Sequence, residues 1–210
     1  MTAPFNRRTK VDVDAANLTR VGIPTPLWKV TGARIQDSVK APIRNLVANL
    51  HEAIHDGACL ILWGNPGVGK SSIAALLARI SRAYTYTALF INAWDLREAL
   101  RTNSMFDDTE SMITRVRNVD VLVIDGLRQQ DLNTKDFYLS SRVIEEIIKH
   151  RTNWRKLTII TTSINKSELD GPEMPGFREA ARTALWLNVT GKDMRAEFNK
   201  EQKKKLLGEE

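Results

Sequence analysis

Gly64-Asn-Pro-Gly-Val-Gly-Lys-Ser71 is the stretch that decides the fold. It follows the apolar run Leu60-Ile-Leu-Trp63 and leads into Ser72-Ile-Ala-Ala-Leu-Leu-Ala-Arg-Ile80, an order that predicts a strand, a glycine-rich loop and a helix. Glycines let the loop backbone turn several N–H groups inward, and the helix start adds its positive dipole end. The stretch therefore predicts a site for a nucleoside triphosphate.

Individual positions of the loop have expected parts in that site. Lys70 is expected to reach the β- and γ-phosphates, and the Ser71 hydroxyl is expected to bind Mg²⁺. The predicted ligands are thus ATP or ADP together with Mg²⁺. The residues expected to hold the nucleotide are Gly64, Asn65, Pro66, Gly67, Val68, Gly69, Lys70, Ser71 and Ser72.

The chain has the size and composition of one globular α/β domain. It has 210 residues, 42% hydrophobic and 27% charged, and no apolar run approaches the ~20 residues of a membrane-spanning helix. Residues 1–10 lack the apolar stretch of a secretory signal, so we expect a cytoplasmic protein without a membrane partner. Cys59 is the single cysteine, which excludes an internal disulfide. The net charge of +6 and the pI near 9.5 fit a polyanionic partner.

Apolar runs and periodicities predict alternating strands and helices. Helical spacing of apolar residues from Val39 to Ile54 predicts an amphipathic helix that ends at Gly57. Such alternation predicts a mainly parallel sheet with helices on both faces and ligands at the carboxyl ends of the strands. Further strands are predicted at 88–92, 121–125, 157–161 and 184–189, and further helices at 95–101, 110–117 and 135–151.

Three parts of the chain differ in composition. Residues 1–35 are polar and basic and are interrupted by Pro24 and Pro26, which predicts a poorly structured arm or linker. Residues 36–192 contain the alternating elements and are expected to form the ATP-binding core. Residues 193–210 include Lys203-Lys-Lys205, and we expect a charged helix or tail that is solvated or touches DNA.

The strand that ends at Asp125 carries the second part of the expected site. Asp125 is expected to hold Mg²⁺ beside Ser71. Many ATPases of this kind have a glutamate next, which polarises the attacking water, but this chain has Gly126. Loss of a general base typically slows a reaction by ~10²–10⁴-fold, so we expect nucleotide binding with slow hydrolysis. The alternatives for a base elsewhere are Asp131, Glu145 and Glu146, and nothing in the sequence favours one of them.

With these motifs in this order, the chain resembles the AAA+ ATPases of the bacterial and phage helicase-loader group, the DnaC- and IstB-like proteins. The resemblance extends over about residues 21–195. It implies an AAA+ P-loop NTPase core whose lid domain is reduced or absent. The segments that carry it are the glycine-rich loop, Gly22-Ile-Pro24, Asn92-Ala-Trp-Asp-Leu96, Val119-Asp-Val-Leu-Val-Ile-Asp125, Ile147-Ile-Lys-His-Arg151 and Leu157-Thr-Ile-Ile-Thr-Thr-Ser163.

The resemblance also implies roles for single polar residues around the γ-phosphate. It places the sensor 1 position near Thr162 and Ser163 and the sensor 2 arginine at Arg195. It places an arginine finger at Arg178, with Arg182 as the alternative. A finger acts on the nucleotide of a neighbouring subunit, so this assignment implies a homo-oligomer.

In proteins of this group, the segment between the second strand and the aspartate strand lines a path for single-stranded DNA. The resemblance therefore implies sequence-independent, salt-sensitive DNA binding by the arginines in this segment. The tryptophans, Trp94 among them, mostly lie in or beside predicted core elements, where packing is the expected role. The arginines concerned are Arg97, Arg101, Arg115 and Arg117.

Three functions are compatible with these features. The leading hypothesis is an ATP-dependent replication helper that assembles on a hexameric replicative helicase or on single-stranded DNA, in a bacterial or phage-infected cell. The first alternative is a nucleotide-gated adaptor without hydrolysis, which Gly126 favours. The second alternative is an IstB-like transposition helper that binds and bends duplex DNA.

Overall fold

The computed structural model describes residues 12–102, 112–132, 140–169 and 182–195. In these residues, five parallel strands form one sheet in the order β2-β3-β4-β1-β5. Near-continuous apolar runs such as Cys-Leu-Ile-Leu-Trp in β1 are typical of parallel strands that are buried on both faces. The strand bounds are β1 Cys59–Trp63, β2 Ala88–Asn92, β3 Val121–Leu127, β4 Leu157–Thr162 and β5 Leu185–Asn188.

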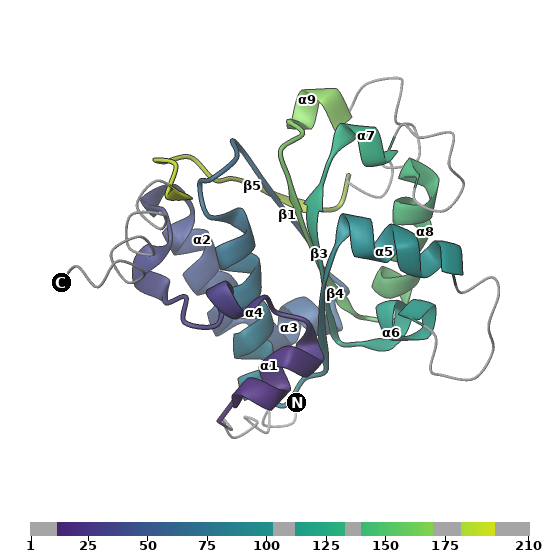
Figure 1. Ribbon diagram of the computed structural model, residues 1–210, viewed down its shortest axis with the longest axis horizontal. Coiled ribbons are helices and arrows are strands. Elements are labelled where there is room, and N and C mark those ends of the chain that lie inside the picture. The colour runs from purple at the N-terminus through teal and green to yellow at the C-terminus, as the bar shows by residue number, and fades with distance from the viewer. Residues whose placement is uncertain (1–11, 103–111, 133–139, 170–181, 196–210) are drawn as a thin grey trace, which may run out of the picture.

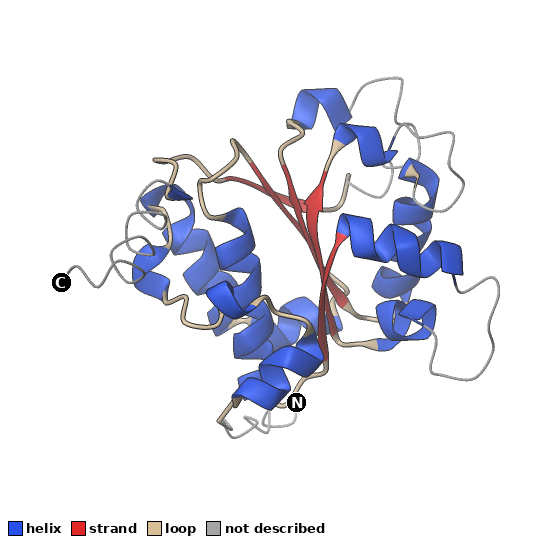
Figure 2. Cartoon of the chain, viewed as in Figure 1, coloured by secondary structure: helices blue, strands red, loops and turns tan. Residues whose placement is uncertain are grey.

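Helices cover both faces of the sheet, α1 to α4 on one side and α5, α6 and α8 on the other (Figures 1 and 2). Successive residues of β1 alternate between the two cores, because Leu60 and Leu62 pack into one and Cys59 and Ile61 into the other. The predicted α/β fold with a parallel sheet is confirmed. No helix in the described ranges is long and apolar enough to cross a membrane. The bounds are α1 Ala15–Val21, α2 Asp37–Ala48, α3 Leu50–His55, α4 Lys70–Ala83, α5 Ala93–Thr102, α6 Met112–Asn118, α7 Gln129–Leu132, α8 Ser141–Asn153 and α9 Lys166–Leu169.

The carboxyl ends of β1, β3 and β4 lie side by side at one edge of the sheet. The parallel register pairs Trp63 with Thr162 and Ile124 with Ile160. β3 continues to Leu127, past its predicted end at Asp125, with a register shift between Ile124 and Leu127. In open parallel sheets, ligands bind at the carboxyl ends of the strands, so this edge is where a site is expected.

The N-terminal segment is folded onto the core, and the prediction of a poorly structured arm is wrong for residues 12–35. α1 is capped at its start by Asp14, whose carboxylate accepts a 2.8 Å hydrogen bond from the Asn17 backbone N–H. It ends at Gly22 with φ +88°, where an added Cβ would lie 2.4 Å from the Phe90 carbonyl oxygen. Leu18 and Val21 are buried in the core, and this apolar contact orders the segment. Two turns of 3-10 helix follow at Thr25–Leu27 and Gly32–Arg34.

Several predicted element ends differ from the observed ones. The helix predicted from Val39 to Gly57 is two helices, α2 and α3, which meet at Asn49. The Asn49 side chain donates a 3.0 Å hydrogen bond to the Asn45 carbonyl, and this bond ends the first helix locally. The short helices α7 and α9 were not predicted. The predicted strands correspond to β2, β3, β4 and β5, with ends that differ by two residues or fewer.

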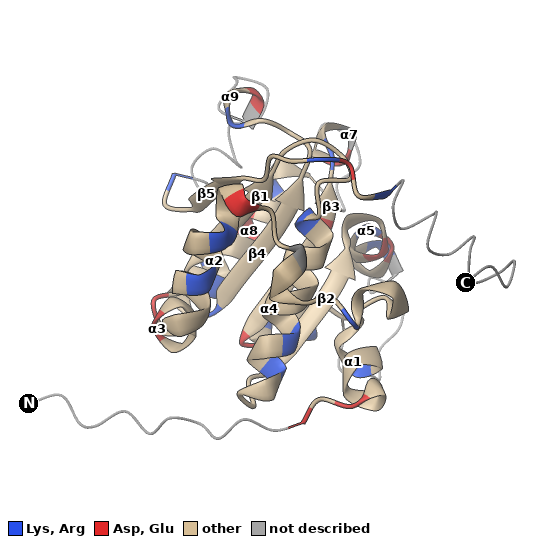
Figure 3. Ribbon diagram, turned by 90° about the vertical axis from the view of Figure 1, so that its left-hand side faces the viewer, with Lys and Arg blue, Asp and Glu red and all other residues tan. Residues whose placement is uncertain are grey.

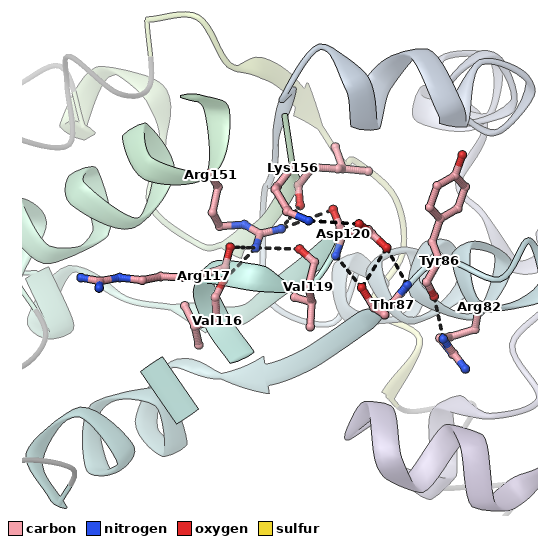
Figure 4. Close-up of polar contacts among 10 residues, drawn as sticks. Arg82, Tyr86, Thr87, Val116, Arg117, Val119, Asp120, Arg151 and Lys156 are labelled. Carbon is pink, nitrogen blue, oxygen red and sulfur yellow. Dashed lines mark hydrogen bonds and ion pairs between the residues drawn. The ribbon is translucent and has the colours of Figure 1, made fainter. Parts of the chain in front are cut away.

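Arg151 of α8 is fully buried and connects α6, β3 and β4 through hydrogen bonds (Figure 4). The Arg151 guanidinium donates to the carbonyls of Val116 and Leu157, both at 2.7 Å, and to the Thr158 hydroxyl at 3.0 Å. Burial lowers the pKa of Arg151 to about 9. Because its donors are satisfied mainly by backbone oxygens, the side chain fixes how α6 leads into β3.

Candidate nucleotide-binding site

The glycine-rich loop connects β1 to α4 in a conformation that depends on its glycines. Gly67 and Gly69 have φ of +85° and +95°, in the left-handed region that side chains disfavour. The Lys70 ammonium donates to the carbonyls of Gly64 at 2.7 Å and Asn65 at 2.8 Å. Partial burial lowers the pKa of Lys70; Asp125 opposes that shift and Arg195 adds to it. The lysine predicted to reach the phosphates thus lies folded over the loop, beside the predicted Mg²⁺ carboxylate.

A cavity of about 740 Å³ opens over this loop. Its volume is within the ~300–1,000 Å³ range of small-molecule sites. Four segments far apart in the sequence form its walls: the glycine-rich loop, residues 26–30, the carboxyl ends of β3 and β4, and residues 194–195. From the loop and α4, the lining residues include Gly67, Gly69, Lys70, Ser71 and Ser72.

The wall at residues 26–30 is apolar and was missed by the sequence analysis. It contributes Pro26, Leu27 and Val30 to the cavity. Arg79 of α4 donates hydrogen bonds to the carbonyl oxygens of Trp28 and Val30, which lie in or beside this wall. Burial lowers the pKa of Arg79. The helix that follows the phosphate loop therefore also holds the opposite, apolar wall of the same cavity.

The structure brings Asp125 together with a threonine of the neighbouring strand. The Thr161 hydroxyl donates a 2.7 Å hydrogen bond to the Asp125 carboxylate and accepts a 2.8 Å bond from the Gly126 backbone N–H. The positions predicted for sensor 1 lie next to it: Thr162 donates to the Leu127 carbonyl at 2.7 Å, and Ser163 is exposed and lines the cavity. Thr161 was not among the predicted site residues, and the sensor 1 role of Thr162 or Ser163 stays a prediction.

Gly126 lies in the register shift of β3 and has φ +75°. An added Cβ would meet no heavy atom within 4 Å. Next to it is a second hollow of about 570 Å³, which Asp125 and Asp131 both line. The other two alternatives for a base pair with cations of their own helix: Glu145 with Lys149, and Glu146 with Arg142 at 3.4 Å. Of the three alternatives, Asp131 is the one that lines the same hollow as Asp125.

Residues 37–170 match the family described as "IstB-like ATP binding protein". The chain belongs to this family. No curated protein matches it. Among solved structures it is similar to the DnaC helicase loader, with 24% identity, 80% of this chain and 100% of that chain covered, and a TM-score of 0.65. It is also similar to DnaI, with 17% identity, 81% and 93% covered and a TM-score of 0.62.

A further similar structure is the replication initiator DnaA bound to AMPPCP and single-stranded DNA. The identity is 16%, the match covers 85% of this chain and 55% of that chain, and the TM-score is 0.60. At these identities the likeness concerns the fold, which is that of AAA+ P-loop domains. The resemblance to the helicase-loader and IstB-like group is thereby confirmed.

In this IstB-like chain, residues 193–195 lie against the phosphate loop. The Met194 backbone N–H donates to the Gly67 carbonyl at 3.0 Å, and Arg195 lines the cavity. An added Cβ at Gly67 would lie 1.9 Å from an oxygen of Asp193, so that side chain would have to move, and the φ of +85° itself disfavours residues other than glycine. Arg195, the residue predicted for sensor 2, thus lies near the loop, and its contact with a γ-phosphate stays a prediction. Arg178 and residues 196–210 of the predicted charged tail lie outside the described residues, and Arg182 is exposed.

The four arginines predicted to bind DNA lie in two places of the IstB-like fold. Arg97 lines the hollow beside Gly126, and its guanidinium lies 5.5 Å from the ring centre of Trp94. Trp94 is 61% exposed, so the expectation that it packs in or beside the core is wrong. Arg101 pairs with Glu98 on α5 at 2.9 Å. On α6, Arg117 is exposed, whereas Arg115 faces α1 at the amino-terminal edge of the sheet.

Proposed function

We propose that the protein is an ATP-binding AAA+ replication helper that assembles on a replicative helicase, on single-stranded DNA, or on both, and whose assembly is controlled by the bound nucleotide. The observation that carries the proposal is the cavity over the glycine-rich loop, which Lys70 and Ser71 line together with Thr161. The family match to ATP-binding proteins supports the ligand.

The residues around the loop fit a Mg²⁺–ATP complex. Ser71 offers a hydroxyl and Asp125 a carboxylate, and oxygen ligands of this kind are what Mg²⁺ prefers. The ion would neutralise phosphate charge during hydrolysis. Thr161 orients the Asp125 carboxylate through its 2.7 Å hydrogen bond. The loop N–H groups would hold the phosphates, and the apolar wall at Pro26, Leu27 and Val30 would contact the base.

Hydrolysis by this site is proposed to be slow. Gly126 carries no side chain that could take a proton from the attacking water. Loss of a general base typically reduces a rate by ~10²–10⁴-fold without removing the groups that bind the phosphates. The nucleotide would then act mainly as a switch for assembly. The alternative in which ATP is bound and never hydrolysed is favoured by the same glycine.

The partners are proposed from charge and from the similar proteins. DnaC is described as a helicase loader, and DnaA has been solved with single-stranded DNA. The net charge of +6 suits a nucleic acid. The family match also keeps open an IstB-like helper that prefers duplex DNA. A homo-oligomer is part of the proposal, with Arg178 or Arg182 acting on the nucleotide of the next subunit.

The proposal is tested by measuring ATP binding, ATP turnover and oligomer size of the purified protein, with and without single-stranded and duplex DNA. We expect Mg²⁺-dependent ATP binding, an ATP-dependent change in oligomer size, and slow turnover that single-stranded DNA stimulates. Lys70→Ala is expected to abolish all three, because the ammonium that reaches the phosphates is lost. ATP binding without any effect on assembly or DNA binding would contradict the replication-helper proposal.

A further inference from the structure

Three arginines surround a pocket at the amino-terminal edge of the sheet, the edge opposite the nucleotide cavity. The pocket has a volume of about 380 Å³ and is bordered by Thr87 and Ala88 at the start of β2. Figure 3 shows basic residues on α1 and on the neighbouring end of α4, at the lower end of that view. The arginines come from three helices: Arg20 of α1, Arg82 of α4 and Arg115 of α6. We call the hollow that these three arginines line the arginine pocket.

Backbone contacts fix two of the three guanidinium groups and leave most of their donors unused. Arg82 donates to the Tyr86 carbonyl at 2.8 Å (Figure 4) and more weakly to the Asn17 side chain at 3.4 Å. Arg115 donates to the Arg20 carbonyl at 3.1 Å. Each guanidinium has five N–H donors, and in the described chain the Arg20 guanidinium has no hydrogen-bond partner.

These charges are only partly balanced, because outside the pocket Asp14 interacts electrostatically with Arg20. None of the described residues that line the pocket is acidic, and none of the three arginines forms an ion pair with a described residue. The nearby Asp120 carboxylate is occupied, because it accepts hydrogen bonds from Thr87 at 2.8 Å and from Lys156 at 3.1 Å (Figure 4). Three like charges around one hollow repel each other unless an anion joins them.

We propose that the arginine pocket binds a phosphate group of a nucleic-acid backbone. Guanidinium forks match the paired oxygens of a phosphate and bind it through two parallel hydrogen bonds. The amides of Asn17 and Asn118, which also line the pocket, add neutral donors. The proposal rests on the DNA contact of the proposed function but not on ATP binding, because the nucleotide cavity lies at the other edge of the sheet. Free phosphate has the same chemistry and is the second source to be tested.

The test compares Arg20→Ala with Arg44→Ala in the full chain. Both changes remove one positive charge from an exposed arginine, but Arg44 of α2 does not line the pocket. Arg20 is chosen because its guanidinium holds no backbone group, so its removal leaves the fold intact. The affinity for a fluorescent single-stranded oligonucleotide is measured at several salt concentrations, together with thermal unfolding and ATP affinity. Broadening of the ³¹P resonance of inorganic phosphate measures binding of the free ion.

We expect Arg20→Ala to weaken DNA binding equally for all sequences and to lower the slope of log affinity against log salt by about 0.7, the value for one phosphate contact on a single strand. Arg44→Ala should leave the slope unchanged, and neither variant should alter the ATP affinity. Equal slopes in the two variants would overturn the proposal. If the wild type binds ATP but no DNA, the nucleic-acid source is refuted; phosphate broadening that requires Arg20 then identifies a free-phosphate site.

Discussion

Arg79 provides the sharpest test of how the nucleotide cavity is built. Its guanidinium ties α4, the helix of the phosphate loop, to the carbonyls of Trp28 and Val30 at the opposite wall. The Trp28 indole N–H, which donates to the Ile23 carbonyl at 2.7 Å, is a further side-chain contact that holds this wall. Removing the guanidinium should therefore loosen the wall that contacts the base while the phosphate loop stays in place.

The expected magnitude follows from the two bonds that are lost. A hydrogen bond from a charged donor contributes roughly 1.5–3 kcal/mol, so the pair holds the wall by about 3 kcal/mol or more. A tenfold fall in the population of the binding-competent wall corresponds to about 1.4 kcal/mol and raises the apparent Kd tenfold. Because the expected loss of about 3 kcal/mol exceeds this value, we expect Arg79→Met, which keeps the length of the stem, to weaken ATP binding by at least about tenfold. Arg79→Lys should weaken ATP binding nearly as much as Arg79→Met, because an ammonium lacks the planar fork of a guanidinium.

The assay is calorimetric titration with two ligands, Mg²⁺–ATP and Mg²⁺–tripolyphosphate. Tripolyphosphate has no base or ribose, so it reports on the phosphate loop alone. Arg79→Met should weaken ATP and leave tripolyphosphate within about twofold of the wild type. Arg44→Met, which removes the same charge from an exposed position on α2, should change neither. Equal weakening for both ligands would show that Arg79 supports the loop itself and would refute the assignment of the wall to the base.

Two further predictions concern residues behind the cavity. Thr161→Val keeps the shape of the side chain but removes its hydrogen bonds to Asp125 and the Gly126 N–H. The ATP affinity measured with Mg²⁺ should therefore fall about 5–10-fold, and the affinity measured without Mg²⁺ should not change. Thr161→Ser, which keeps the hydroxyl, should behave as wild type. Burial raises the pKa of Cys59 from 9.0 to about 12, so the folded state keeps a thiol proton that the unfolded chain loses. Between pH 9.0 and about pH 12, the free energy of unfolding should therefore fall more steeply with rising pH than it does in Cys59→Ala. Urea unfolding of both proteins across this range measures the two slopes, and equal slopes would contradict the prediction.

The parts of the fold that the sequence predicted well are those set by local patterns. The run Val121-Leu-Val-Ile is continuously apolar because a parallel strand is buried on both faces, and such a run can be read without any knowledge of its neighbours. The glycine-rich loop is equally local, since its conformation depends on φ values that glycine alone adopts easily. The edge at which a ligand is expected then follows from the general rules of α/β sheets.

The parts that the sequence did not predict depend on contacts between distant segments. Leu18 and Val21 make α1 part of the core only because β2 lies beneath them, and seven helical residues carry too short a period to reveal this. The same holds for the cavity wall at Leu27, which a helix fifty residues away holds in place through Arg79. Thr161 was passed over because a threonine in a buried strand is common, and its role depends on the bulge of the neighbouring strand.

That bulge also determines how the absence of an acid at position 126 can be tested. Gly126→Glu puts a non-glycine residue at φ +75°, which costs roughly 1–2 kcal/mol of stability, but the side chain has open space. Gly126→Gln carries the same strain and nearly the same shape without the carboxylate, so the ratio of the two turnover rates isolates the base. If the missing acid limits hydrolysis, Gly126→Glu should exceed Gly126→Gln by ~10²-fold or more while both unfold at the same reduced temperature. Equal rates would mean that Asp131 already serves the attacking water, or that a neighbouring subunit limits the reaction. Asp131→Asn then separates these two cases, because it lowers turnover only in the first.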